Sequence, residues 1–389
     1  MDKKKESLGL NTRLQHPPKV NLQKGNEPLV APIYQSVKYS FESYESLVAN
    51  QMTGFFYSRI SNPTVRQLEK QLAELQGRDD AICVSTGVAS ISLPLIALLK
   101  KDDHVILFTE SYMPTRYLIR DLLAKYGVTH TLLSVREAYH LEKHIQKGKT
   151  RLVIFETPTN PSLSVFNLKA LTATARAQGV LTLLDNTLAG FHQHGQYDVD
   201  IYIHSLTKYA SGHGDVMGGA IITSEKLLQL IKPIVWNVGA TLDPHAAYLL
   251  LRGMKTYHLR YERQCENAFK VASFLEKHSM IKKVSYPGLA SHPHHALVRE
   301  QMKEFGTIVT AELQSAEKLP SFINRLKQFV LAGSLGSTES LIAPAKRFFG
   351  VDLNEEQLKQ AQLFDGTFRL SIGIEDSEDL IRDLDQALS

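Results

Sequence analysis

The apolar residues of the chain first recur with a helical period. Asn62 can cap a helix, and Pro63 suits its first position. Apolar side chains then follow at spacings of three and four until a glycine ends the pattern: Val65, Leu68, Leu72, Leu75 and Gly77. We therefore predict a helix that begins at Pro63 and ends before Gly77.

Short apolar runs then alternate with further helical patterns. The runs predict strands at 81–84, 104–108, 151–155, 180–184 and 201–203. Helical patterns lie after Gly87, near 117–126 and near 168–178. This alternation predicts an α/β fold whose mainly parallel sheet is covered on both faces, and in such sheets ligands bind beyond the carboxyl ends of the strands.

A second domain is expected after Pro244. A helical pattern covers 246 to about 278, followed by strand-like runs at 308–313 and 368–372 and by helices near 320–328, 355–362 and 380–388. Asn354 and Gln357 have the spacing of a capping box. Residues 1–50 lack a long amphipathic period and are broken by prolines. We predict an extended arm over 1–50, a large domain over 51–245 and a small C-terminal domain over 246–389.

Composition narrows the class of protein. The chain has 389 residues, of which 43% are hydrophobic, enough for more than one core. Its 44 Lys and Arg against 40 Asp and Glu leave a net charge of +4, too mild to indicate nucleic acid as the main partner. No apolar run approaches the roughly 20 residues that span a bilayer, so no membrane partner is expected. No apolar signal segment follows Met1, so we expect a cytoplasmic protein.

The cysteines and the densest histidine cluster do not indicate a metal site. Cys83 and Cys265 lack a metal-ligating or redox spacing, so both are expected to be reduced packing residues. The run His292-Pro293-His294-His295 has no cysteine or acidic residue beside it. We interpret this run as a polar surface turn and expect no bound metal.

A lysine follows two hydroxyl residues at the end of one apolar run, in Ser205-Leu206-Thr207-Lys208. The hydroxyls can bind a phosphate and the amine can attack an aldehyde, which are the needs of pyridoxal phosphate. Taken alone, the segment is as well explained by a surface lysine beside a polar turn. Polar residues also follow other predicted strands, as Ser85-Thr86-Gly87, Asn160 and Asp185-Asn186-Thr187. Their convergence at one edge of the sheet favours a ligand-binding site there.

These residues belong to a longer pattern that resembles the Cys/Met-metabolism (trans-sulfuration) family of pyridoxal-phosphate-dependent enzymes. The family includes cystathionine γ-synthase, cystathionine γ-lyase, cystathionine β-lyase and methionine γ-lyase. The likeness extends from Ala-Pro-Ile-Tyr-Gln-Ser at 31–36 to Arg-Leu-Ser-Ile-Gly-Ile-Glu-Asp at 369–376. It implies the aspartate-aminotransferase-like fold type I, with a mainly parallel seven-stranded sheet in the large domain and a smaller α+β C-terminal domain.

The resemblance implies pyridoxal 5'-phosphate as the cofactor, bound covalently to Lys208. The amine of Lys208, once released, would carry protons at the substrate. The resemblance also implies that Asp185 pairs with the pyridine nitrogen, with Thr187 nearby, and that Tyr112 stacks on the ring and shuttles protons. A charged partner keeps the nitrogen protonated and so strengthens the cofactor as an electron sink.

Phosphate binding is implied for two groups of residues. Ser205, Thr207 and the backbone N–H groups of Gly87 and Val88 form the first group, at the start of a helix whose positive end favours an anion. Tyr57 and Arg59, followed by Ile-Ser-Asn-Pro-Thr at 60–64, resemble the family's phosphate clamp, which the neighbouring subunit supplies. Self-association is therefore expected, as a homotetramer or dimer of dimers.

Substrate binding is implied for Arg369, with Ser334 and Asn160 assisting. A planar guanidinium binds a carboxylate through two parallel hydrogen bonds, which suits the α-carboxylate of an amino acid. Outside this motif, a surface arginine would be the simpler interpretation.

The departures from the family pattern lie where the substrate is selected. Met113-Pro114 after Tyr112 resembles some bacterial β-lyases, and Gly333 replaces a common Glu or Tyr. Leu188 stands where an aromatic residue is common, and 344–350 replaces a His-Pro-Ala-x-Met-Thr-His segment. The identity of the substrate's distal group therefore stays open.

The expected function is elimination or replacement at Cβ or Cγ of a sulfur amino acid or activated homoserine ester, in cysteine metabolism or methionine biosynthesis. Cystathionine γ-synthase or γ-lyase activity comes first and cystathionine β-lyase second, followed by methionine γ-lyase or homoserine-ester sulfhydrylase. The alternatives outside this group are a fold-type-I aminotransferase and a cofactor-binding protein without turnover.

Overall fold

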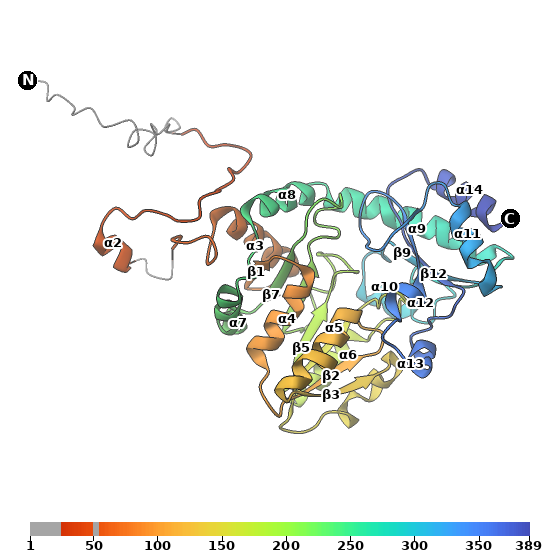
Figure 1. Cartoon of the computed structure of the whole chain (residues 1–389), viewed down its shortest axis with the longest axis horizontal. Helices are drawn as coiled ribbons and strands as arrows, with labels where there is room; N and C mark the ends of the chain where they lie inside the picture. Colours follow the sequence, from red (N-terminus) through yellow and green to blue (C-terminus); the bar gives the residue numbers. More distant parts are fainter. Residues whose placement is uncertain (1–24, 50–53) are drawn as a thin grey trace, which may run out of the picture. The chain divides into compact units, whose positions relative to one another are not determined.

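The computed structural model describes residues 25–49 and 54–389 (Figure 1). Residues up to Ile33 and residues from Tyr34 onward form two separate units. In the first unit, the described residues 25–33 contain no helix or strand. Residues 1–24 and 50 of the predicted arm lie outside the described residues. In the second unit, Tyr44–Ala49 forms a short helix, α2, where an extended segment was predicted.

The first sheet of the second unit is mainly parallel, as predicted. Among the described residues, seven strands lie in the order β1-β7-β6-β5-β4-β2-β3. β7 is antiparallel to β1 and β6, and the other neighbours are parallel. The strands are β1 (Asp80–Val84), β2 (His104–Phe108), β3 (Thr129–Leu133), β4 (Thr150–Glu156), β5 (Leu181–Asp185), β6 (Ile201–Ser205) and β7 (Gly219–Thr223).

Helices cover both faces of this sheet because successive side chains of each strand point into different cores. In β2, Ile106 and Phe108 enter one core, whereas Val105 and Leu107 enter the other. The first core is closed by α3 (Pro63–Gln76), α6 (Leu168–Ala177), α8 (Pro244–Met254) and the first half of α9 (Tyr257–Lys277). The second is closed by α4 (Gly87–Leu98), α7 (Glu225–Val238) and the π-helical turn Leu118–Leu122 after α5 (Met113–Tyr117).

A second, mostly antiparallel sheet packs against the other half of α9. In the described part of the chain its strand order is β10-β11-β12-β9-β8. These strands are β8 (Ile281–Ser285), β9 (Ile308–Leu313), β10 (Val330–Leu331), β11 (Leu341–Pro344) and β12 (Thr367–Ser371). Their core includes residues of α11 (Leu319–Arg325) and α14 (Ser377–Leu388), while α10 (His295–Gln301), α12 (Ala345–Phe349) and α13 (Glu355–Gln360) lie between strands in the sequence.

The second sheet confirms the predicted separate C-terminal α+β part. The division at 245/246 remains a proposal. It falls just inside α8, whose Leu250 packs in the first core. Because α9 contributes Tyr261 to the first core and Val271 to the second, this helix joins the two halves of the second unit.

Helix capping follows the sequence prediction closely. Asn62 accepts a hydrogen bond from the Thr64 N–H, and Gly77 ends α3 with φ 65°. Asn354 and Gln357 form the predicted capping box at α13. The predicted apolar face of α3 is wrong at Leu75, whose side chain is exposed.

The predicted long helix over 246–278 is wrong, because the structure divides it into α8 and α9. The break lies at Lys255 and Thr256. Arg260 Nη2 donates to the carbonyl of Gly253 at 2.8 Å, which satisfies an acceptor at the C-terminal end of α8. The apolar period continues across this break, so it does not reveal the interruption.

The sequence did not predict β3, β7 and α7, nor β8, β10, β11, α10 and α12 in the C-terminal part. β7 begins at a glycine, which weakens a strand pattern. A side chain at Gly219 would collide with the carbonyl of Thr86, so the glycine lets β7 pass close to the residues that follow β1.

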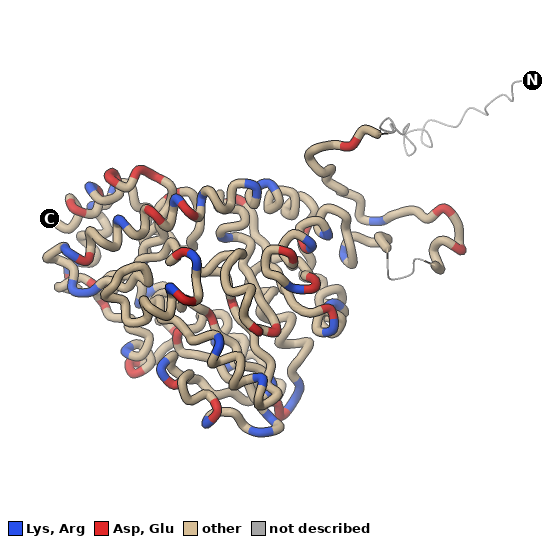
Figure 2. Tube along the Cα trace, turned by 180° about the vertical axis from the view of Figure 1, so that it is seen from behind, with Lys and Arg blue, Asp and Glu red and all other residues tan. Residues whose placement is uncertain are grey.

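The prediction for the two cysteines is confirmed, whereas the prediction for the histidine run is wrong in part. Cys83 and Cys265 are free and buried, as predicted. The predicted surface turn is wrong for His292, whose side chain is buried and whose pKa is lowered to about 4, chiefly by that burial. None of the described helices is long and apolar enough to cross a membrane. Figure 2 shows basic and acidic residues interspersed along the described chain.

Candidate active site

Lys208 lies in a turn directly after β6, and hydrogen bonds fix this turn. The Lys208 N–H donates to the Ser205 carbonyl at 3.3 Å, and the Gly212 N–H donates to the Lys208 carbonyl at 2.8 Å. The Thr207 hydroxyl accepts from the Gly218 N–H at 3.1 Å, which ties the turn to the residue before β7. The lysine backbone is therefore held at the carboxyl edge of the sheet.

The amine of Lys208 lies in a setting that favours its neutral form. Its Nζ donates to the hydroxyl of Ser334 at 2.7 Å. Burial lowers the pKa of Lys208 to about 8, the positive charge of Arg369 also lowers it, and the carboxylate of Asp185 opposes both effects. A larger fraction of this amine than of an ordinary lysine is therefore free to act as a nucleophile or base near neutral pH.

Asp185 ends β5, the strand beside β6. The Thr187 N–H donates to Asp185 Oδ1 at 3.0 Å, and the Thr187 hydroxyl accepts from the Ser205 N–H at 2.9 Å. Burial raises the pKa of Asp185, while the Thr187 hydrogen bonds and the charge of Lys208 lower it. Among the described residues, Lys208 supplies the positive charge that stabilises this carboxylate.

The first turn of α4 lies against Ser205. The Thr86 side chain accepts from the Ala89 N–H at 3.0 Å, but within the described chain no hydrogen bond engages the N–H groups of Gly87 and Val88. A Cβ at Gly87 would lie 2.7 Å from both Cβ and Oγ of Ser205. The structure thus brings together the open N–H groups of a helix and the serine hydroxyl, and glycine is required for that approach.

Arg369 projects from β12 as a buried cation with free hydrogen-bonding capacity. Its Nη1 donates to Asn160 Oδ1 at 3.1 Å, and its Nη2 donates to the carbonyl of Ser334. Its Nε is buried without a partner among the described residues. Burial lowers the pKa of Arg369 to about 10, still well above neutral pH, so the group stays charged. A buried charge with unused donors favours binding of an anion.

Ser334 connects the amine to the guanidinium. Its hydroxyl accepts from Lys208, and its carbonyl accepts from Arg369. Ser334 has φ 88°, a backbone conformation that a serine seldom adopts. Such strained residues often occur at functional sites, where surrounding contacts hold them.

Tyr112 is half-exposed and contacts a carboxylate that the sequence analysis missed. Glu156, the last residue of β4, accepts from the N–H groups of Tyr112 at 3.2 Å and Asn160 at 2.6 Å. Glu156 also pairs in register with Asp185. Burial, reinforced by the charge of Asp185, raises the pKa of Glu156 well above its usual range. Its place at a strand end was the available signal, but no motif distinguishes it.

Two of the departures from the family pattern, Gly333 and segment 344–350, also lie close together. A Cβ at Gly333 would lie 3.1 Å from the ring of Phe348, so the glycine leaves space for that ring. The ring of Phe349 lies 4.6 Å from the Arg369 guanidinium carbon, measured to its centroid. Segment 344–350, which differs from the family pattern, therefore places an aromatic ring over the buried arginine.

Tyr57 and Arg59 do not join the other predicted site residues within the chain. Arg59 Nη1 donates to the Trp236 carbonyl at 2.6 Å, and its guanidinium carbon lies 5.5 Å from the Tyr57 ring centroid. The Tyr57 side chain is exposed. Among the described residues, no hydrogen bond, ion pair or ring contact connects either side chain to Lys208.

Comparison with known proteins shows to which family the chain belongs. Residues 15–389 match a family described as Cys/Met metabolism PLP-dependent enzyme. The chain is 38% identical to an L-methionine γ-lyase of Fusobacterium nucleatum subsp. polymorphum, over 92% of this chain and 93% of that protein. It is 37% identical to a cystathionine γ-lyase of Bacillus subtilis, with the same coverage of 92% and 93%.

A solved structure supports the same relationship. It comes from Campylobacter jejuni, is assigned as an O-acetylhomoserine (thiol)-lyase, and contains N'-pyridoxyl-lysine-5'-monophosphate. It superposes with a TM-score of 0.89 at 31% identity, covering 95% of this chain and 97% of that chain. The predicted fold type I is confirmed by this likeness and by the two sheets.

Proposed function

Because the chain belongs to the Cys/Met-metabolism family of pyridoxal-phosphate (PLP)-dependent trans-sulfuration enzymes, we propose that it eliminates or replaces a substituent at Cγ of a sulfur amino acid or activated homoserine ester. The observation that carries this proposal is a pair of groups joined by Ser334, the Lys208 amine and the Arg369 guanidinium. The amine suits covalent chemistry and the guanidinium suits an α-carboxylate, which are two requirements for processing an α-amino acid.

The residues present fit PLP. The carboxylate of Asp185 can pair with a protonated ring nitrogen, and the Lys208 amine can bond to the aldehyde. The hydroxyls of Ser205 and Thr207 and the open N–H groups at the start of α4 suit a phosphate, and any side chain at Gly87 would intrude on this cradle. When bound, PLP would supply an electron sink for the negative charge left at the substrate's Cα.

Lys208 is proposed to move the protons of the substrate. Its pKa of about 8 lets the released amine accept a proton from Cα near neutral pH and return it. Reaction at Cγ requires loss of a second proton, from Cβ, and we assign that step to Lys208 as well. The hydrogen bond to Ser334 orients the amine between these transfers.

Tyr112 is proposed to act as an acid toward the leaving group. Burial raises the pKa of its hydroxyl, and the charges of Asp185 and Glu156 raise it further. The hydroxyl therefore stays protonated at neutral pH and is better suited to donate a proton than to accept one. Asn160 would assist Arg369 by fixing its Nη1.

The pKa of Lys208 predicts how cofactor attachment depends on pH. The neutral amine attacks the aldehyde, so the reactive fraction of apoprotein should rise about tenfold between pH 7 and pH 9, around a pKa of about 8, and then level off. Stopped-flow absorbance after mixing PLP with apoprotein measures this rate. A rate that rises steadily through pH 10 instead would show that the pKa of Lys208 is not lowered.

We propose that the active unit contains at least two chains, with Tyr57 and Arg59 acting at the partner's site. Of the described residues between 34 and 57, the large apolar or aromatic side chains exposed in one chain are Tyr34, Val37, Tyr44, Leu47, Val48, Phe55 and Tyr57. Burial of such side chains against a second copy would stabilise a dimer. We retain a homotetramer as the proposed assembly.

Complementation tests the shared site. Lys208→Ala and Arg59→Ala should each abolish activity alone, but coexpression should restore about a quarter of it, because half of random dimers are mixed and each mixed dimer contains one intact site. That quarter applies to the unfractionated mixture, whereas mixed dimers isolated through two different tags should have about half of the wild-type activity. Failure to regain activity, with mixed dimers present, would place Arg59 in its own chain's site.

A substrate panel tests the proposed reaction. Holoenzyme should release 2-oxobutyrate and a thiol from L-cystathionine or L-methionine, or form a thioether from an O-acylhomoserine and a thiol. Pyruvate without 2-oxobutyrate would show reaction at Cβ. Production of an oxo acid without a leaving group would indicate an aminotransferase, and a cofactor spectrum unchanged by every compound would indicate a binding protein without turnover.

Reaction at Cβ, as in cystathionine β-lyase, is the second candidate. The observation that favours it is Met113-Pro114 at the start of α5, directly after Tyr112, because this pair resembles the sequence of some bacterial β-lyases. Proline restricts the backbone beside the tyrosine that we assign as the acid. Methionine γ-lyase and homoserine-ester sulfhydrylase activities follow, and all are separated by the products of the same panel.

We also propose the cytoplasm as the compartment. Cys83 and Cys265 are both free and buried, which is in keeping with a reducing environment.

A further inference from the structure

Arg116 and Arg369 are equally buried but differ in how many N–H groups they use. Each side chain has five N–H donors, and each residue is 2% exposed. In the described part of the chain, Arg369 leaves its Nε unpaired. Arg116 uses all five donors, toward both carboxylate oxygens of Asp352 and the carbonyls of Thr109, Ser111 and Phe349. Arg116 therefore has no donor available for a ligand.

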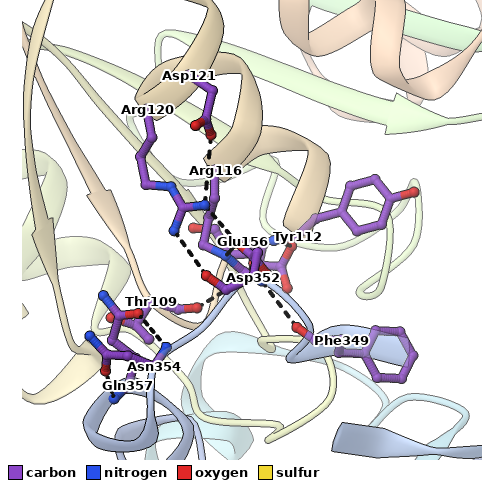
Figure 3. A network of polar contacts seen from close by, with 11 residues as sticks. Thr109, Tyr112, Arg116, Arg120, Asp121, Glu156, Phe349, Asp352, Asn354 and Gln357 are labelled. Atoms are coloured by element: carbon purple, nitrogen blue, oxygen red, sulfur yellow. Dashed lines mark hydrogen bonds and ion pairs between the residues drawn. The ribbon is translucent and has the colours of Figure 1, made fainter. Parts of the chain in front are cut away.

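Arg116 and Asp352, which are far apart in the sequence, form a bidentate ion pair. Arg116 Nε donates to Asp352 Oδ2 at 2.9 Å, and Nη2 contacts Oδ1 at 2.5 Å (Figure 3). Arg120 adds a second ion pair to Asp352 at 3.0 Å. Burial opposes ionisation of Asp352, but the hydrogen bonds and positive charges of the two arginines lower its pKa below the usual value. Asp352 is thus ionised at neutral pH.

This ion pair fixes the segment that covers Arg369. Arg116 Nη2 donates to the carbonyl of Phe349 at 3.0 Å, three residues before Asp352. The Phe349 ring lies over the guanidinium of Arg369, 4.6 Å from centroid to carbon. In Figure 3 the rings of Tyr112 and Phe349 both point to the same side of the ion pair. Helix α5, which follows Tyr112, is therefore tied directly to the wall above Arg369.

We propose that Asp352 is a positioning residue for substrate carboxylate binding: through Arg116 it holds Phe349 against Arg369. The inference rests on the proposed function, because it assigns the α-carboxylate to Arg369. An aromatic ring over one guanidinium face excludes water there and limits the rotation of the group. Its in-plane N–H groups are then already oriented toward a carboxylate, so the guanidinium loses less conformational entropy when substrate binds.

Asp352→Asn tests the clamp in the holoenzyme. The variant weakens one side of the ion pair, and the apparent Kd for L-methionine and for L-cystathionine, followed by cofactor absorbance, should rise about tenfold. The Kd for L-methioninamide, which lacks the carboxylate, should stay within twofold of wild type. Asp352→Glu keeps the charge and should recover much of the affinity. Asp121→Asn is the matched control, because Asp121 contacts Arg120 but not Arg116.

A double-mutant cycle separates positioning from general destabilisation. Phe349→Leu should raise the same Kd values, and adding Asp352→Asn should cause little further change, because both substitutions remove one interaction. Multiplying effects would show that Asp352 does not act through Phe349. Equal weakening of methioninamide binding would show a structural role rather than carboxylate positioning.

Labelling with phenylglyoxal gives a result that needs no substrate. Modification of Arg369, located by peptide mass spectrometry, should be about tenfold faster in Asp352→Asn holoenzyme than in wild type or Asp121→Asn. Unchanged labelling and unchanged Kd values would overturn the clamp. If wild-type holoenzyme binds neither amino acid, the proposed function fails, whereas faster labelling of Arg369 would still show that Asp352 controls its cover.

Discussion

Replacing Lys208 by alanine is expected to lower the turnover number by at least about a thousandfold. A positioned acid or base contributes about 10²- to 10⁴-fold, and we assign two proton transfers as well as cofactor attachment to this amine. The fold should survive, because among the described residues the Lys208 side chain makes a single hydrogen bond, to Ser334. Steady-state kinetics after reconstitution with PLP, with circular dichroism as a check on folding, measures the effect.

Lys226→Ala is the matched control for that experiment. Lys226 is an exposed lysine in the first turn of α7, and within the described chain no hydrogen bond or ion pair joins it to a site residue, so its variant should keep wild-type turnover. Added methylamine should restore part of the activity of Lys208→Ala, because a small amine can enter the vacated space and carry protons. Retention of more than about a tenth of the wild-type turnover by Lys208→Ala would remove Lys208 from the mechanism.

Replacing Arg369 by methionine is expected to weaken substrate binding about 100- to 1000-fold without lowering thermal stability. Each charge-assisted hydrogen bond contributes about 1.5–3 kcal/mol. Losing two bonds at the weaker end of that range, about 1.5–2 kcal/mol each, costs roughly 3–4 kcal/mol, at 1.4 kcal/mol for each factor of ten. Stability should be preserved because the buried cation has no carboxylate partner among the described residues and methionine fills a similar volume. Titration of cofactor absorbance and calorimetry give the two quantities.

Arg325→Met serves as the control for Arg369→Met. Arg325 is exposed at the end of α11, so its loss should change neither affinity nor unfolding temperature. Unchanged affinity in Arg369→Met would refute the assignment of the carboxylate to this arginine. A large fall in unfolding temperature would show instead that Arg369 supports the fold.

The strand-end part of the site could be predicted from the sequence because it is encoded locally. Asp185 and Ser205 each end a run of buried apolar residues, and parallel strands place such ends at one edge of a sheet. The helix start at Gly87 is equally local, since it follows β1 directly. For these residues, the apolar run and the polar residue that ends it are adjacent in sequence.

The cover of the site could not be predicted because it depends on contacts between distant segments. The hydrogen bonds between Arg116 and Asp352 join residues 236 positions apart, and neither residue has a distinguishing local pattern. Glu156 ends a strand as Asp185 does, but its role depends on its contacts with Tyr112 and Asn160, which only the folded chain brings to it. The break between α8 and α9 was hidden for a different reason, because the apolar period continues across Lys255 and Thr256.

Borohydride reduction of the holoenzyme followed by peptide mapping tests the central claim most directly. The purified protein should be yellow, and reduction should fix the cofactor on the peptide that contains Lys208, with loss of the visible absorbance. Lys208→Ala protein, reduced in parallel, should carry no label on that peptide. Attachment at another lysine, or a wild-type protein that remains colourless after incubation with PLP, would contradict the account.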